Sequence, residues 1–357
     1  MKGKEYRYFV NGNTARGYYN LLSSNIEGLQ VIVLEAPPYS GQKEILQAIR
    51  DHWLNQGMSV ECIFSAMNPN ELVGVIQRDQ LVVFLDGTLQ MRFPLPAEKI
   101  SRISLFDALD ESHWLQLAPK LEEIHKEIEE SCSQAYRAFG EALTIHDEWE
   151  DIYISHLDFE EANRLTEQWI QRLFPEPSHE KKGSTVHRFL GAATPYGPVD
   201  FIPNLTDDVP HRYYIKGRPG SGKSTMLKKV VSYAEKLGYD VEVYHCGLDP
   251  YSLDMVMVRE LNFTIFDSTA PHEYFPSRKG DEIIEFYGTV IDPTTDETYK
   301  DELADIISRY KEKMDEGTKK LWTAKEKWDE WKNYIEKVIN TQKVEEIQQQ
   351  IRNQWIG

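Results

Sequence analysis

The sequence predicts an α/β fold made of two tandem units, each a parallel sheet covered by helices and followed by long charged helices. Three observations favour this fold class. Strand-like and helix-like segments alternate along the chain, the two halves align with each other at a constant shift, and apolar residues recur every seven positions after each sheet unit. We place the units at residues 1–180 and 181–357.

The repeat is found by sliding the sequence against itself. A shift of 181 residues aligns residues 31–88 with residues 212–269 without a gap. Thirteen pairs are identical in the same order, among them Pro38 and Pro219, Ser40 and Ser221, Gly41 and Gly222, and Asp86 and Asp267. Chance is a poor explanation of such a match, so the sequence indicates a duplication.

Each copy has the pattern strand, turn, helix, strand, helix, strand. In the second copy Gly238 follows the first helix, where a helix end favours a residue with positive φ. Asp249 and Pro250 then mark a turn. The elements expected there are a strand at Arg212–Lys216, a helix at Ser224–Leu237, a strand at Val241–Cys246 and a strand at Phe263–Phe266 that ends at Asp267. This alternation predicts a parallel sheet.

A heptad pattern follows each sheet unit. In the second copy one apolar series consists of Ile307, Met314, Leu321, Trp328 and Ile335. A second series consists of Leu303, Tyr310, Gly317, Ala324, Trp331 and Val338. The pattern predicts a continuous helix of about 54 Å from Leu303 to Val338, packed closely against the corresponding helix of the other copy, in which the repeat is weaker. The alternative is a turn at Asp315–Gly317 between two ordinary helices.

Composition excludes several classes of protein. The formal net charge of −18 repels nucleic acid and anionic lipid over most of the surface, and no apolar stretch approaches the ~18 residues that a membrane span needs. Cys62, Cys132 and Cys246 have no CxxC spacing, and the first ten residues lack the apolar core of a secretion signal. We therefore expect a reduced, cytoplasmic protein that binds neither nucleic acid nor membrane.

The strongest chemical signal is a match to GxxxxGK[ST] between a predicted strand and a predicted helix. Glycines free of Cβ let backbone N–H groups point at a phosphate chain, and the helix N-terminus adds partial positive charge. Lys223 would bridge the β and γ phosphates, and Ser224 would bind Mg²⁺. The sequence thus predicts P-loop NTPase-like units that bind ATP and Mg²⁺ through Gly217, Arg218, Pro219, Gly220, Ser221, Gly222, Lys223, Ser224 and Thr225.

Acidic and imidazole groups follow the later strands of the second copy. Asp267 closes an apolar strand, where a Walker B carboxylate would hold Mg²⁺ together with Ser224, although a terminal Asp also commonly caps a turn. No glutamate follows Asp267, so Asp249 and His272 are the alternative candidates for a catalytic role beside Lys223 and Asp267. His272 would equally suit a hydrogen-bonded loop position.

The first copy lacks these requirements. In its loop, Ala36–Lys43, Gln42 stands for the lysine, Lys43 for the serine and Tyr39 for a glycine. A charge-assisted hydrogen bond is worth roughly 1.5–3 kcal/mol, so loss of the lysine alone weakens phosphate binding many-fold. We interpret this half as a pseudo-NTPase; the alternative is that Lys43 shifts one place and restores binding.

The whole pattern resembles a little-characterised bacterial family of tandem P-loop ATPases, sometimes labelled nucleotide kinases. The resemblance spans nearly the whole chain and is carried by Gly12 to Gly17, His187 to Phe201, Gly217 to Ser224, Cys246 to Asp254 and Asp267 to His272. It implies tandem nucleotide-binding units. Family members can carry an intact P-loop in the first half as well, and this chain departs from them there.

Three functions from different classes fit these features. An ATPase would hydrolyse ATP to move the helical arms or a protein partner bound through them. A nucleotide or small-molecule kinase would pass the γ-phosphate to an acceptor, with Arg278 and Lys279 as a cationic lid or simply part of a solvated loop. A regulatory protein would sense nucleotide without turnover. The long acidic helices favour the ATPase.

Overall fold

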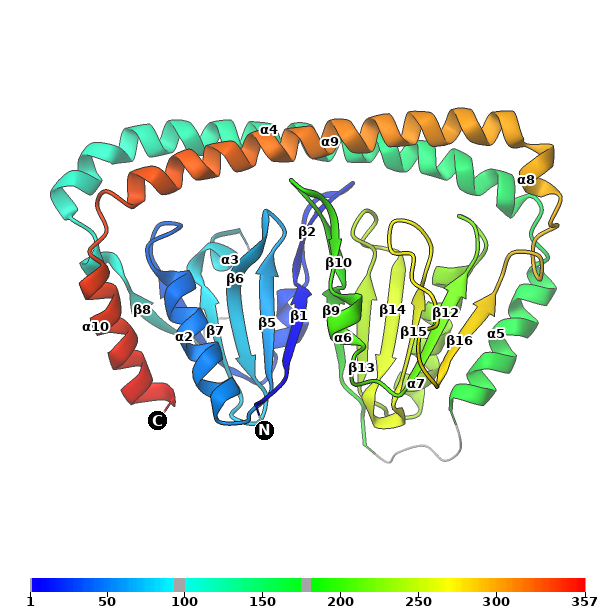
Figure 1. The fold of residues 1–357 in the computed structure, drawn as a ribbon, viewed down its shortest axis with the longest axis horizontal. Helices are drawn as coiled ribbons and strands as arrows, with labels where there is room; N and C mark the ends of the chain where they lie inside the picture. The colour runs from blue at the N-terminus through cyan, green and yellow to red at the C-terminus, as the bar shows by residue number, and fades with distance from the viewer. Residues whose placement is uncertain (1, 93–99, 175–180, 357) are drawn as a thin grey trace.

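The computed structural model describes residues 2–92, 100–174 and 181–356, and within them it has a mixed α/β architecture. Twelve of the described strands form one sheet in the order β16-β12-β15-β14-β13-β9-β1-β5-β6-β7-β4-β8. Two long helices cross above one edge of both halves of this sheet (Figure 1). The junction of the halves is the antiparallel contact between β1 and β9, where Phe9 faces Phe189.

The first half of the sheet, with the hairpin and helices attached to it, is built from residues 2–92 and 100–104. The sheet strands, in spatial order, are β1 (Glu5–Phe9), β5 (Val60–Ser65), β6 (Asn68–Gln77), β7 (Val82–Asp86), β4 (Gln30–Glu35) and β8 (Ile100–Ser104). Strands β2 (Asn11–Thr14) and β3 (Gly17–Asn20) form a hairpin, and the helices are α1 (Leu22–Ile26), α2 (Gln42–Asn55) and α3 (Gly87–Arg92).

The second half has the same strand order and pairing directions. Its sheet strands are β9 (Thr185–Phe189), β13 (Val241–His245), β14 (Leu253–Val258), β15 (Phe263–Asp267), β12 (His211–Lys216) and β16 (Asp281–Glu285). A hairpin is formed by β10 (Gly191–Thr194) and β11 (Gly197–Asp200), and the short helices are α6 (Ile202–Leu205), α7 (Lys223–Lys236) and α8 (Thr295–Thr298). The predicted elements β12, α7, β13 and β15 are confirmed within one residue at each end, and Gly238 has φ +82°.

The expectation of a parallel sheet with a second helix in each copy is wrong. That segment is a strand in both halves, β6 and β14, and each pairs antiparallel with both neighbours. Four consecutive apolar residues, Met255 to Val258, are buried, so the segment has no polar side to present to solvent. The short connections on either side bring the chain back antiparallel. The sheet is therefore mixed.

The long helices confirm the heptad prediction. Helix α4 (Glu111–Ile154) and helix α9 (Lys300–Ile335) are continuous and pack against each other, and Gly317 lies against the ring of Phe139, where a Cβ would clash. Ile307 is the exception, since it is 42% exposed: the first turns of α9 bury Leu303 and Ile306 against the second half instead. None of the described helices is long and apolar enough to cross a bilayer.

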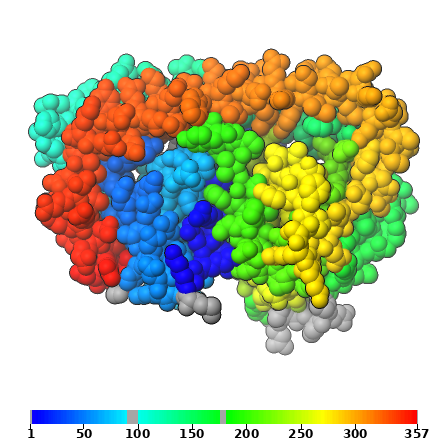
Figure 2. All heavy atoms as spheres, viewed as in Figure 1, coloured from blue at the N-terminus to red at the C-terminus, as the bar shows by residue number. Residues whose placement is uncertain are grey.

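Each long helix starts at one half of the sheet and ends at the other. Ile152 and Tyr153, at the end of α4, and helix α5 (Phe159–Leu173) pack into the core of the second half. Helix α10 (Thr341–Ile351), which follows α9, packs into the core of the first half. In the space-filling view α9 extends along both halves (Figure 2). A residue near the C-terminal end of α4 is therefore placed to contact the glycine-rich loop of the second half.

Candidate functional site

The glycine-rich loop lies between β12 and α7, as the sequence predicts. Gly220 has φ +70° and Gly222 has φ +93°, which are left-handed conformations that a residue with a Cβ adopts only at a cost. A Cβ on Gly217 would lie 2.7 Å from the buried Ser221 Oγ. The loop conformation therefore favours glycine at all three positions. It leads into the N-terminus of a 14-residue helix, a favourable place for an anion.

Lys223 and Asp267 meet because β12 and β15 are adjacent parallel strands. Lys223 Nζ donates to the carbonyl oxygen of Arg218 at 2.7 Å and lies 3.6 Å from Asp267 Oδ2. The other oxygen of Asp267, Oδ1, accepts hydrogen bonds from the N–H and hydroxyl of Thr269 at 3.1 and 2.7 Å. Those bonds hold the carboxylate so that Oδ2 faces the lysine. The predicted Walker A lysine and the predicted Walker B aspartate thus lie together.

Ser224 lies in the first turn of α7, and its Oγ accepts a hydrogen bond from the N–H of Leu253 at 3.0 Å. This bond fixes the serine side chain and leaves a lone pair for another ligand. Hydroxyl and carboxylate oxygens are donors that Mg²⁺ prefers, so Ser224 and Asp267 fit the predicted cation. Thr225, the next residue, is exposed.

The other predicted loop residues have structural partners. Arg218 donates to Asp296 at 2.6 Å and stacks on the ring of Tyr287, so its guanidinium ties the loop to the segment before α9. Pro219 is half-buried in the loop. Arg278, considered as a lid, donates to the backbone carbonyls of Thr206, Asp207 and Val209. Its guanidinium therefore has a structural role, whereas Lys279 is exposed.

Helix α4 supplies acidic groups to this loop that the sequence analysis missed. The N–H of Gly220 donates to Glu150 Oε1 at 3.3 Å, and a Cβ on Gly220 would lie 2.7 Å from the backbone oxygen of Glu150. His146 Nδ1 lies 3.8 Å from the same Glu150 oxygen, and ligand atoms of His146, Asp147 and Glu150 all lie within 4.8 Å of one another. Burial lowers the pKa of His146. The heptad pattern predicted helix α4, but no local sequence signal predicts the contact of Glu150 with Gly220, which lie 70 residues apart.

A cavity of about 160 Å³ lies beside Asp267, between the end of the sheet and α9. It is lined by side chains that include Cys246, Asp254, Asp267, Thr269, His272 and Tyr310. Burial and the charge of Asp267 raise the pKa of Asp254 to about 7. The structure thus brings His272 and Asp267 to one cavity.

His272 is held by a carboxylate partner. Its Nδ1 lies 2.8 Å from Asp200 Oδ2, and the hydroxyl of Tyr274 donates to Asp200 Oδ1 at 2.8 Å. Burial lowers the pKa of His272, but the hydrogen bond to Asp200 and the charges of nearby carboxylates outweigh burial and raise it. The Asp200 contact orients one ring nitrogen and leaves Nε2 for another partner.

Asp249 lies outside this cavity. It follows β13 by four residues, and its Oδ1 accepts a hydrogen bond from Arg16 Nε at 2.9 Å. Arg16 belongs to the turn between β2 and β3 of the first half. Asp249 is therefore part of a contact between the two halves, which sequence reasoning did not anticipate.

The loop of the first half has the same backbone shape but a filled interior. Tyr39 has φ +67° and Gly41 has φ +95°, close to the values at Gly220 and Gly222. Gln42 Oε1 accepts from the N–H of Ser40 at 2.8 Å, while Gln42 Nε2 donates to the carbonyls of Ala36 and Pro37 at 3.2 and 2.9 Å. The side chain of Gln42 thus accepts the hydrogen bond of the Ser40 N–H, which would otherwise be available to a ligand.

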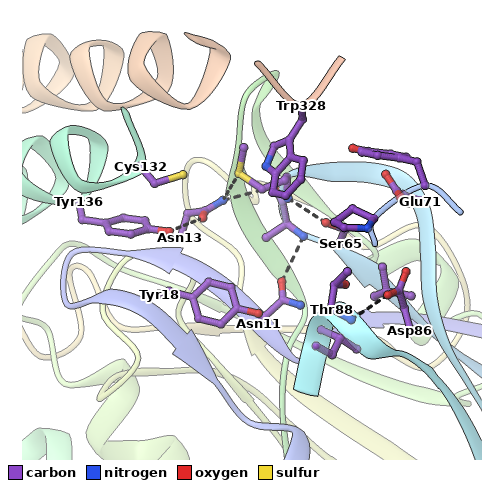
Figure 3. A pocket seen from close by; sticks show the side chains of 16 residues that line it. Asn11, Asn13, Tyr18, Ser65, Glu71, Asp86, Thr88, Cys132, Tyr136 and Trp328 are labelled. Carbon is purple, nitrogen blue, oxygen red and sulfur yellow. Dashed lines mark hydrogen bonds between the residues drawn. The ribbon is translucent and has the colours of Figure 1, made fainter. Parts of the chain in front are cut away.

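A cavity of about 110 Å³ lies beside this first loop (Figure 3). Asp86, which corresponds to Asp267, accepts a hydrogen bond from the N–H of Thr88 at 2.8 Å. Burial raises the pKa of Asp86 to about 6. Trp328 of α9 closes the cavity, and its ring lies 6.1 Å from that of Tyr39. In this half Gln42 and Lys43 stand where the second half has Lys223 and Ser224.

Comparisons of the chain with models of known protein families, with curated proteins and with solved structures found no match.

Proposed function

We propose that the protein is a Mg²⁺-dependent P-loop ATPase with one active site at Gly217–Ser224 and a first half that is a pseudo-NTPase. The observation that carries this proposal is the contrast between two loops of the same backbone shape. One presents Lys223 beside Asp267, with Ser224 next to the lysine in the first turn of α7, and the other is closed by the side chain of Gln42. The corresponding strand order of the halves supports tandem P-loop NTPase-like units formed by duplication.

The roles of the residues follow from their positions. Lys223 exchanges its contacts with Arg218 and Asp267 for the β and γ phosphates, and the backbone N–H groups of the loop donate to phosphate oxygens. Ser224 and Asp267 would hold Mg²⁺, which would neutralise charge that develops on the phosphate oxygens. Asp267 in turn is oriented by Thr269.

Hydrolysis joins the oxygen of water to the γ-phosphorus. The bond from that phosphorus to the bridging oxygen breaks, its electron pair goes to ADP, and the proton of water passes to the released phosphate. His272 lines the cavity beside Asp267 and is held by Asp200, so it orients the attacking water. The ATPase would transmit nucleotide state to the helical arms and to a protein bound there, because Glu150 of α4 contacts the loop.

The cavity beside Asp267 favours a second candidate, a nucleotide or small-molecule kinase. Its volume of about 160 Å³ accommodates part of an acceptor, and Asp254 and His272 supply polar groups for a hydroxyl. In this alternative the acceptor oxygen takes the place of water. The lining contributed by Tyr310 of α9 would then shape the acceptor site.

Calorimetric titration with a non-hydrolysable ATP analogue and Mg²⁺ tests the proposal. We expect a stoichiometry near one, with binding lost in Lys223→Ala and retained in the matched variant Gln42→Ala. Gln42→Ala removes three loop hydrogen bonds, so it should lower stability by roughly 1–3 kcal/mol without abolishing binding. A stoichiometry near two would overturn the assignment of the first half.

Phosphate release from ATP and GTP, with and without nucleoside acceptors, separates the functions. Turnover without an acceptor supports the ATPase, and turnover only with an acceptor supports the kinase. Tight binding of nucleotide without either kind of turnover would indicate a nucleotide sensor.

A further inference from the structure

The two hairpins cross the junction between the halves, so that each reaches the other half. In Figure 1 the tips of β2 and β10 cross below the long helices. The N–H of Ala15, at the tip of the first hairpin, donates to the carbonyl of Leu248 at 2.9 Å, and Arg16 Nε donates to Asp249 Oδ1 at 2.9 Å. The first half thus places an arginine at the loop after β13, on the second half.

Arg16 is held at this loop by interactions that leave part of its side chain in solvent. The guanidinium lies 4.2 Å from the centre of the Tyr251 ring, and the side chain is 42% exposed. A partly exposed pair with Asp249 contributes little to stability. The guanidinium is therefore free to exchange Asp249 for a more highly charged anion.

Neighbouring charged groups at the end of α4 lie near both Arg16 and the P-loop. Asp147 of α4 and Asp249 both act electrostatically on Arg16. His146, next to Asp147, is influenced by the charges of Lys223 and Asp249 and lies 3.8 Å from Glu150 Oε1. Glu150 accepts from the N–H of Gly220. Arg16 and the P-loop therefore face one cluster on α4.

The equivalent hairpin of the second half provides an internal comparison. The tip of its turn carries Tyr196, whose ring lies 5.6 Å from that of Trp322 on α9. Trp328, on the same helix, has its ring 6.1 Å from that of Tyr39, in the closed loop of the first half. The hairpin of the first half thus places an arginine at the loop after β13, whereas the hairpin of the second half places a tyrosine against α9, the helix that also contacts the degenerate loop.

The geometry points to Arg16 as an arginine finger that the first half contributes to the ATP site of the second half. This inference rests on the function proposed above. In the reaction, water bonds to the γ-phosphorus, the bond to the β–γ bridging oxygen breaks, and the electron pair stays on ADP. Arg16 leaves Asp249 and donates to phosphate oxygens whose negative charge grows during this step. The pseudo-NTPase half is thereby a component of the active site.

The test separates binding from stabilisation of the transition state. In the full chain, Arg16→Ala should lower turnover of ATP by about 10³-fold or more, while affinity for ADP with Mg²⁺ changes by less than about threefold. ADP with aluminium fluoride mimics the phosphoryl group during transfer, so the unmodified protein should bind it more tightly than it binds ADP alone. The Arg16→Ala variant should bind both ligands with the same affinity. Arg16→Lys should recover only a small part of the turnover, because a single ammonium lacks the planar donor fork.

Tyr196→Ala is the matched control, since it alters the equivalent turn beside the degenerate loop. It should retain both turnover and the aluminium fluoride effect. Full turnover in Arg16→Ala or in Arg16→Lys would overturn the inference. An equal loss of affinity for ADP and for ADP with aluminium fluoride would also overturn it, because an equal loss indicates a structural role of Arg16. If the unmodified protein binds no nucleotide, the proposed function itself fails, an outcome that this design distinguishes.

Discussion

Replacement of Arg188 by methionine tests what joins the two halves of the sheet. Arg188 lies on β9, and its side chain is 3% exposed. Its guanidinium contacts one glutamate from each half, Glu61 at 2.8 Å and Glu242 at 3.0 Å, and its Nε donates to Asn25 at 2.8 Å. It also lies 4.1 Å from the centre of the Tyr8 ring. Methionine fills a similar volume but offers no charge.

The expected loss of stability follows from the groups that remain. Removing one partner of a buried ion pair costs about 3–5 kcal/mol, because the other charge is left without compensation. Glu61 keeps a partner in Arg78 at 2.8 Å, and Glu242 keeps Arg259. We therefore expect the lower end of that range, about 3 kcal/mol.

The pH dependence provides a second measure. Burial raises the pKa of Glu61, but the charges of Arg188 and Arg78 outweigh burial and lower it to about 2, from an ordinary value of 4.5. The unfolded chain therefore takes up this proton first as the pH falls. The contribution of Glu61 to stability is fully present above about pH 4.5 and is lost progressively toward pH 2, on the order of 3 kcal/mol in all.

Urea unfolding followed by tryptophan fluorescence measures both effects. The curves of the unmodified protein and of Glu61→Gln should differ at neutral pH and converge as the pH falls toward 2. Arg188→Met combined with Glu61→Gln should cost at least about 1 kcal/mol less than the sum of the single changes, since the two groups interact directly. A loss below about 1 kcal/mol in Arg188→Met, or strict additivity, would refute the assignment of this cluster as the link between the halves.

Three predictions concern the nucleotide site. Asp267→Asn should lose the Mg²⁺-dependent binding or turnover of ATP, measured by magnesium titration; an unchanged dependence on magnesium would assign the metal to another carboxylate. His272→Ala should keep binding and lower turnover by ~10²-fold, and Asp200→Asn should act in the same direction, because Asp200 orients the imidazole. Full turnover in His272→Ala would leave the histidine a structural role. Glu150→Gln should raise affinity for ATP about fivefold in calorimetry, since a neutral amide oxygen competes less strongly than a carboxylate for the N–H of Gly220. Unchanged affinity would show that Glu150 does not compete with phosphate.

Local patterns in the sequence were sufficient to predict several elements. The glycine-rich loop, helix α7, strand β15 ending at Asp267 and the continuous helix α9 each follow from contiguous residues or from a fixed period. Such signals depend on backbone conformation and on which face of an element is apolar, and both are local properties. They also identified Gln42 as the departure in the first loop, although not the hydrogen bonds by which it closes that loop.

Tertiary structure decided the strand directions and the composition of the site. A buried apolar run such as Met255–Val258 has no period that distinguishes helix from strand, so only packing on both faces makes β14 an antiparallel strand. The contacts of Glu150 with Gly220 and of Arg16 with Asp249 join residues 70 and 233 positions apart. No local pattern encodes such pairs, because they arise from long helices and hairpins that cross from one half of the sheet to the other.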